Sequence, residues 1–192
     1  MALVNTKEML KRAQKERYAV GAFNANNMEI VQAIIETAEE ERAPVILQAS
    51  QGAIKYAGLD SIVAMVKVMA EKTTIPVALH LDHGTDYYQN IKCLRAGFTS
   101  LMFDGSKLPF EENVEMTRKV VEMAHTCDIP VEAELGQIGK MGDSDEPGVA
   151  LEKVKKMMAK PDEAAKFVKL TEIDSLAAAV GTIHGCRTPF AK

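Results

Sequence analysis

Short, mostly apolar runs alternate with longer amphipathic segments along the whole chain. The short runs, several of them opened by proline, are typical of buried strands. In the longer segments apolar side chains recur every three or four positions, which is typical of helices with one buried face. Strands are predicted at residues 18–23, 44–48, 75–79, 99–103, 130–136 and 175–180, and helices at residues 5–17, 30–41, 60–72, 86–95, 109–124 and 161–170.

The order of these elements is strand then helix, repeated six times. Continuous apolar strands, rather than alternating ones, indicate a parallel sheet that is covered by helices. A doubly wound open sheet would satisfy this pattern, but no strand is followed by a glycine-rich dinucleotide turn. Polar side chains instead recur at the ends of nearly every strand, as at the mouth of a barrel. We therefore predict an α/β fold of the (β/α)8 TIM-barrel type, one partial domain over residues 1–192 with about six of the eight units.

Length and composition indicate one globular domain. The chain has 192 residues, of which 47% are hydrophobic and 26% charged, enough for a proper core. A net charge of −4 gives no reason to expect nucleic acid or an anionic membrane as a partner. No signal peptide and no apolar run near the ~20 residues of a membrane span is found. Three widely spaced cysteines (Cys93, Cys127 and Cys186) favour reduced thiols in a cytoplasm over a disulfide framework.

Ionisable side chains are most concentrated at residues 80–84 (HLDHG), directly after the third predicted strand. Period-two alternation puts His80 and Asp82 on one face of that strand, and His83 falls where the strand turns into a loop. The carboxyl ends of buried parallel strands are where α/β sheets place their chemistry. The alternative is a histidine–aspartate pair that merely satisfies local hydrogen bonds.

Polar residues at the other strand ends would converge on the same site in a barrel. Imidazole and carboxylate together suit a zinc-type cation, provided that they meet in space. Glu132 and Glu134 point to one face of the fifth strand, and burial without a partner would cost several kcal/mol, so we expect at least one of them to meet a cation. The candidates are Asn24, Ser50, Asp82, His83, Asp104, Glu134 and His184.

Several of these residues also have a purely structural interpretation. Asn24 could cap the helix that follows it. Asp104 and Ser106 could cap the helix that begins at Pro109. His125 lies near the end of a predicted helix, where a structural role is the simpler expectation.

Four motifs, taken together, resemble one enzyme family. They are residues 80–84 (HLDHG), 103–106 (FDGS), 131–136 (VEAELG) and 181–185 (GTIHG), with weaker support from residues 21–27 and 108–113. In this order they closely resemble the zinc-dependent class II ketose-bisphosphate aldolases, from near residue 1 to about residue 185. The resemblance implies a (β/α)8 barrel that splits fructose- or tagatose-1,6-bisphosphate into dihydroxyacetone phosphate and glyceraldehyde 3-phosphate.

The same resemblance implies roles for the ionisable residues. His83 and His184 resemble two of the three histidines that hold the catalytic zinc, and Asp82 resembles the acid/base that acts on the C4 hydroxyl. Asp104 and Glu134 resemble carboxylates near the metal, used when it shifts or when a second divalent or monovalent cation binds. The chemistry suits them, because a divalent cation stabilises the enediolate left by retro-aldol cleavage and a carboxylate takes the hydroxyl proton.

Substrate contacts and partners follow from the resemblance as well. Asn24 and Ser50 resemble residues that contact the substrate, and Gly185 resembles a backbone contact to the dihydroxyacetone phosphate moiety. The expected partners are the sugar bisphosphate, the triose phosphates and further copies of the chain, since family members are usually homodimers or homotetramers. Whether the sugar is fructose or tagatose bisphosphate is left open.

Two departures from the family pattern limit this interpretation. The third zinc histidine and the phosphate loops lie beyond the sixth strand in the family, so we expect this sequence to represent roughly its N-terminal two-thirds. In the loop at residues 139–148, Glu146 or Asp145 could replace the family's second acid/base. A truncated, non-catalytic barrel with an exposed edge strand is therefore an alternative. A Schiff-base aldolase is disfavoured, because it needs a desolvated strand lysine and the six predicted strands contain none.

Overall fold

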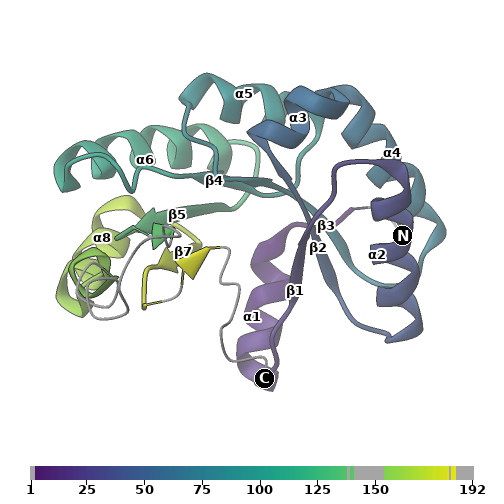
Figure 1. Ribbon diagram of the computed structural model, residues 1–192, viewed down its shortest axis with the longest axis horizontal. Coiled ribbons are helices and arrows are strands. Elements are labelled where there is room, and N and C mark those ends of the chain that lie inside the picture. The colour runs from purple at the N-terminus through teal and green to yellow at the C-terminus, as the bar shows by residue number, and fades with distance from the viewer. Residues whose placement is uncertain (1–2, 138, 141–153, 182, 185–192) are drawn as a thin grey trace.

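A computed structural model describes residues 3–137, 139–140, 154–181 and 183–184, and Figure 1 shows its helices and strands. The strands are β1 (Gly21–Asn24), β2 (Val45–Ser50), β3 (Val77–Asp82), β4 (Leu101–Phe103), β5 (Val131–Leu135), β6 (Gly139–Lys140), β7 (Ser175–Ala178) and β8 (Ile183–His184). The helices are α1 (Thr6–Glu16), α2 (Met28–Glu40), α3 (Gln51–Ala57), α4 (Leu59–Lys72), α5 (Tyr87–Ala96), α6 (Phe110–His125) and α8 (Pro161–Thr171).

Six parallel strands stand side by side in the order in which they occur in the chain. β1, β2 and β3 form one parallel sheet, and β4, β5 and β7 form another. A parallel bridge between His80 and Ser100 joins the two sheets, so that β3 lies beside β4. A doubly wound sheet would reverse this order at a switch point, whereas a barrel preserves it. The prediction of a (β/α) barrel with about six units is therefore confirmed.

The outer face of the strands packs on the helices. Leu47, Leu79 and Leu81 are fully buried and belong to one large core with helix residues such as Ile35 and Ile62. Neighbouring helices contact one another in sequence order, α2 with α4, α4 with α5, α5 with α6 and α6 with α8 (Figure 1). Burial of this face fixes the register, because a slip of one residue would turn every leucine away from the helices.

The alternate residues of the same strands point to the inside of the curved sheet. At the amino-terminal end of the strands, Ile46 and Ala78 are buried against Met9 of α1. Further along, the inward positions become polar, with Gln48 paired in register with His80 and Ser50 with Asp82. α1 thus closes the apolar end of the interior, and the polar side chains gather toward the carboxyl ends of the strands.

Local sequence signals set several helix ends. The side chains of Asn5, Asn27 and Asp86 accept hydrogen bonds from the backbone N–H groups of the first turns of α1, α2 and α5. α5 ends at Ala96 and is followed by Gly97, whose φ of 102° is the left-handed conformation that glycine adopts easily. These interactions depend only on close neighbours in sequence, yet the suggested cap of α2 was Asn24 rather than Asn27.

Several predicted boundaries were wrong. β1 begins at Gly21 rather than at residue 18, and β2 and β3 continue to Ser50 and Asp82. No helix was predicted between the strand at residues 44–48 and the helix at residues 60–72, but Ser50 caps α3 there, a helix of seven residues whose only buried side chain is Ala53. So short a helix shows no clear apolar periodicity. β6 lies in the predicted loop at residues 139–148, of which residues 141–148 fall outside the described residues.

Membrane-spanning helices and disulfides were not expected from the composition. In the described part of the chain, no helix combines the length and the hydropathy that crossing a membrane would require. Cys93 is buried and Cys127 is exposed, and neither forms a disulfide. Cys186 lies outside the described residues.

Replacing Gly84 with alanine should lower the free energy of unfolding by about 1–3 kcal/mol, because the core there has no room for a further methyl group. A Cβ atom on Gly84 would lie 2.5 Å from the carbonyl oxygen of Met102 and 2.6 Å from Cδ2 of Leu81. Gly52, inside α3, is a matched control, since its nearest neighbour would be 3.6 Å away. Gly52→Ala should be neutral or stabilising by up to about 1 kcal/mol. Urea unfolding of both variants measures the difference, and equal midpoints would contradict the expectation.

Candidate active site

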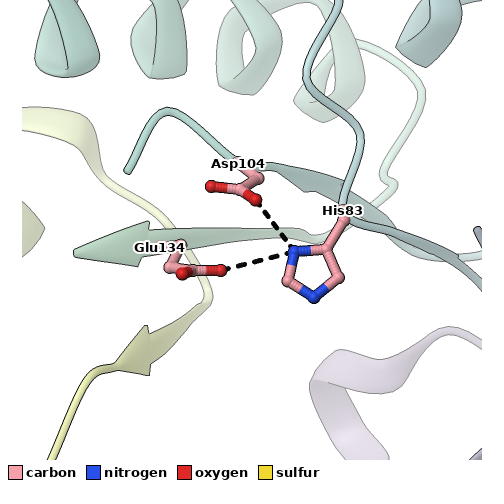
Figure 2. Close-up of side chains that lie close together, drawn as sticks. All are labelled: His83, Asp104 and Glu134. Carbon is pink, nitrogen blue, oxygen red and sulfur yellow. Dashed lines mark hydrogen bonds and ion pairs between the residues drawn. The ribbon is translucent and has the colours of Figure 1, made fainter. Parts of the chain in front are cut away.

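Three ionisable side chains converge at the carboxyl ends of neighbouring strands (Figure 2). His83 follows β3, Asp104 follows β4 and Glu134 lies near the end of β5. His83 Nδ1 is 2.8 Å from Asp104 Oδ2 and 3.5 Å from Glu134 Oε2, and one candidate ligand atom from each residue lies within 4.8 Å of the other two. The exposed fraction falls from 37% for the His83 side chain to 12% for Asp104 and 3% for Glu134.

This cluster fits a divalent cation such as zinc. Imidazole and carboxylate are both zinc ligands, and tetrahedral bonds of about 2.1 Å put ligand atoms roughly 3.4 Å apart. The distance of 3.5 Å between His83 Nδ1 and Glu134 Oε2 matches that spacing. The shorter distance to Asp104 is a hydrogen bond, which a small rotation of either side chain would open. The cluster can therefore hold a metal ion without rearrangement of the strands.

The contacts within the cluster shift the pKa values of its members. The hydrogen bond to Asp104 raises the pKa of His83 to about 9 against the effect of burial, and the negative charges of Asp82, Asp104 and Glu134 add to it. Burial alone would raise the pKa of Asp104, but hydrogen bonds from His83 and Ser106 outweigh burial and lower the pKa to about 2. A cation that binds here displaces the imidazolium proton and takes over its attraction to the carboxylates.

Asp82 lies beside the cluster, at the last position of β3. Asn24 Nδ2 donates a hydrogen bond to Asp82 Oδ2 at 2.9 Å, and Gln48 Nε2 donates one to Asp82 Oδ1 at 3.4 Å. Asp82 Oδ1 is also 3.9 Å from His83 Nε2. Amides on β1 and β2 therefore hold both carboxylate oxygens, as suits a base that must meet a substrate proton in a set orientation.

Gln48 was not among the predicted site residues. It lies in an apolar run, Val45 to Ala49, and period-two alternation with Ser50 turns it toward the interior. An amide at an inward position of a predicted buried strand was the signal that could have identified it. Its importance depends on the pairing of β2 with β3, which places Gln48 near Asp82.

The structural interpretations of Asn24 and Asp104 do not describe their contacts. Asn27, not Asn24, caps α2, and the Asn24 amide binds Asp82 instead. Asp104 accepts hydrogen bonds from Ser106 N and Oγ within its own turn, while α6 begins at Phe110 after Pro109 and has no side-chain cap. Both residues are thus directed to the site.

A second group of polar side chains lies nearer the amino-terminal ends of the strands than the cluster. His80 Nδ1 pairs with Ser100 Oγ at 2.8 Å, and Ser100 pairs with Thr6 of α1 at 2.9 Å. Burial lowers the pKa of His80 to about 4, and burial together with the charge of Asp82 raises the pKa of Glu132 to about 7. Of the two strand glutamates, Glu134 lies 3.5 Å from His83 Nδ1 and Glu132 lies 3.7 Å from His80 Nε2. That at least one of them meets a cation stays a prediction.

His125 has the structural role that was expected. Its Nε2 lies 2.8 Å from Asp174 Oδ2, and Asp174 also binds Lys7 Nζ and the backbone N–H of Val131. This group ties α6, α1 and the start of β5 together at the opposite end of the strands from the cluster.

The remaining candidates lie at the edge of the described residues or beyond it. The His184 backbone belongs to β8, which pairs in parallel with β6, and its role as a metal ligand stays a prediction. Gly185, Asp145 and Glu146 lie outside the described residues. Ser50 lies opposite Asp82 in the β2–β3 register, with its hydroxyl turned to the cap of α3.

Comparison with known proteins gives consistent matches over nearly the whole chain. The sequence model of a family described as fructose-bisphosphate aldolase class-II matches residues 4–191. Fructose-bisphosphate aldolase of Helicobacter pylori (strain J99) is 50% identical over 184 residues, and the probable fructose-bisphosphate aldolase of Bacillus subtilis is 50% identical over 188 residues. The crystal structure of the YdjI aldolase from Escherichia coli K12 matches with a TM-score of 0.83 at 35% identity.

These matches cover unequal shares of the two partners. The Helicobacter pylori match includes 95% of this chain but 59% of the relative, and the Bacillus subtilis match 96% and 64%. The structural match covers 95% of this chain and 64% of the other. The chain thus spans about three-fifths of the length of the curated relatives that it matches.

Proposed function

Because the chain belongs to the class II fructose-bisphosphate aldolase family, we propose that it serves the metal-dependent aldol cleavage and condensation of a ketose 1,6-bisphosphate. Fructose 1,6-bisphosphate is the proposed substrate, since curated relatives that are 50% identical are named fructose-bisphosphate aldolase. The products are dihydroxyacetone phosphate and glyceraldehyde 3-phosphate. The observation that carries the proposal is the cluster of His83, Asp104 and Glu134 directly beside Asp82.

The family's metal dependence and this cluster together support zinc as the cofactor. His83 and Glu134 have the spacing of zinc ligands, with Asp104 next to them and His184 as the proposed further ligand. When bound, the ion supplies Lewis-acid stabilisation of the negative charge that develops on the substrate oxygens.

Asp82 is the proposed acid/base for the C4 hydroxyl. Cleavage of the bond between C3 and C4 requires that this hydroxyl lose its proton, and a carboxylate near the cleaved bond can accept it. Asn24 and Gln48 orient the two oxygens of Asp82 by donating hydrogen bonds to them. In condensation the same carboxyl group returns the proton to the new hydroxyl.

The proposed substrate contacts are Asn24, Ser50 and Gly185. Asn24 and Ser50 lie at the carboxyl ends of β1 and β2, on the same rim as Asp82. The proposal also includes a homodimer or homotetramer, which follows from the family resemblance. It includes a cytoplasmic location, which follows from the cysteine usage.

The test is metal removal and restoration with the 192-residue chain. Cleavage of fructose 1,6-bisphosphate, followed through triose phosphate formation, should stop after treatment with a chelator and return with one equivalent of zinc. Parallel assays with tagatose 1,6-bisphosphate distinguish the two sugars. Cleavage that persists without metal would reject the proposal, and tight zinc binding without any cleavage would favour the non-catalytic alternative.

A further inference from the structure

We propose that Gln51 is a positioning residue that holds the His83 backbone in the conformation required to aim the imidazole at Asp104 and Glu134. The inference rests on the proposed function, because His83 matters here as a metal ligand. No motif identified in the sequence includes Gln51, and its amide binds the His83 backbone rather than the imidazole.

His83 has an unusual backbone conformation. Its φ is 50°, in the left-handed region, at the point where the chain leaves β3. Residues other than glycine rarely adopt this region, because Cβ lies too close to a backbone carbonyl oxygen there, so the surrounding structure must hold it. The conformation is also what directs the ring, because a different φ at His83 would swing Cβ and the imidazole away from β4 and β5.

Gln51 supplies that restraint from a neighbouring element. Its Nε2 donates hydrogen bonds to the His83 carbonyl oxygen at 2.8 Å and to Thr85 Oγ1 at 2.9 Å. These two acceptors flank Gly84, so one side-chain amide spans the whole turn. Because both bonds are short, a rotation of the His83 peptide would break at least one of them.

The amide is itself anchored. Gln51 is the first residue of α3 and directly follows Ser50, which is paired with Asp82 in the sheet and caps the helix. Its backbone is thus fixed relative to β3 before the side chain makes any contact. A group carried on a sheet and a helix restrains a loop more tightly than one carried on another loop.

A second contact of the His83 backbone, at its N–H group, is weaker. The backbone N–H of His83 points to the thioether sulfur of Met102, 3.4 Å away, and thioethers are poor acceptors. Gly84 contributes through its carbonyl, which accepts a hydrogen bond from Asp104 N at 2.9 Å. This bond connects the turn after β3 with the residue that follows β4. The hydrogen bonds of Gln51 connect the same turn with α3, which directly follows β2.

A purely structural role for Gln51 leads to a different expectation. If Gln51 served only to begin α3, then methionine or alanine would replace it without loss, since both are better or equal helix formers. If Gln51 positions His83, the same replacements remove both N–H donors and release the turn. Metal binding is then weakened although α3 remains intact.

The experiment measures zinc affinity of the 192-residue chain by competition with a chromophoric chelator. The variants are Gln51→Met and Gln51→Ala, with Gln14→Met, an exposed position on α1, as the matched control and His83→Ala as the reference for a lost ligand. We expect both Gln51 variants to bind zinc roughly tenfold more weakly, as outer-shell partners do. The visible absorption spectrum of bound Co²⁺ should shift in the same two variants, while the control matches the unmodified chain in both measurements.

Thermal unfolding of the metal-free variants shows that each one is folded before affinities are compared. Unchanged zinc affinity and an unchanged Co²⁺ spectrum in both Gln51 variants would overturn the inference while leaving the proposed function intact, provided that His83→Ala loses binding. If the unmodified chain binds no zinc, or if His83→Ala binds as well as the unmodified chain, the proposed metal site fails and the inference fails with it.

Discussion

Replacing His83 with alanine should abolish tight zinc binding and, with it, the zinc-dependent cleavage of fructose 1,6-bisphosphate. His83 Nδ1 is the nitrogen that faces both Asp104 and Glu134, so its loss leaves two carboxylates without the imidazole between them. Loss of an outer-shell partner costs about 10–100-fold in metal affinity, and loss of a ligand should exceed that range. Chelator competition measures the affinity, and triose phosphate formation measures the cleavage.

His125→Ala is the matched control for this variant. The His125 side chain has the same exposed fraction as that of His83, 37%, and it also pairs with an aspartate at 2.8 Å. It lies at the far end of the strands, where Asp174 keeps its contacts with Lys7 and with the Val131 backbone. Zinc affinity should be unchanged in His125→Ala. Equal zinc affinities in the two variants would show that the metal does not depend on His83.

Asp82→Asn should lower the cleavage rate by about 10²–10⁴-fold, the usual contribution of general acid–base catalysis. The amide has nearly the shape of the carboxylate but cannot accept the C4 hydroxyl proton as a base. Zinc content should stay at one per chain, since Asp82 Oδ1 is no nearer to His83 than 3.9 Å. Steady-state rates of the zinc-loaded protein, together with metal analysis, separate the two effects.

Asp60→Asn, an exposed change on α4, provides the control for the altered charge. Its cleavage rate should equal that of the unmodified chain. If Asp82→Asn retained full activity, another group would have to remove the proton. If it lost both activity and zinc, Asp82 would belong to the metal site rather than to proton transfer.

The elements were predictable where they depend on neighbours in sequence. The apolar runs of β2 and β3 mark strands wherever they lie in the fold. α3 was not predicted, because a helix with one buried alanine shows no apolar period. The alternation of strands and helices indicated a parallel sheet, and the polar residues at the strand ends favoured a barrel over a doubly wound sheet.

The partners of the site residues were not predictable in the same way. Asn24 had two reasonable interpretations, and only the pairing of β1 and β2 with β3 decided that its amide binds Asp82 rather than capping α2. Gln48 and Gln51 were not predicted as site residues, because the atoms that accept their hydrogen bonds lie 34 and 32 residues away in the chain.

The sequence by itself determined which side chains lie at the strand ends, because the apolar run of a strand and the polar residues that end it are consecutive in the chain. Only the tertiary structure decided which of them meet. The distance between His83 and Glu134 is set by the curvature that brings β3, β4 and β5 side by side, and by the left-handed turn at His83. Curvature and turn arise from the packing of all the strands and helices at once, so no local pattern encodes them.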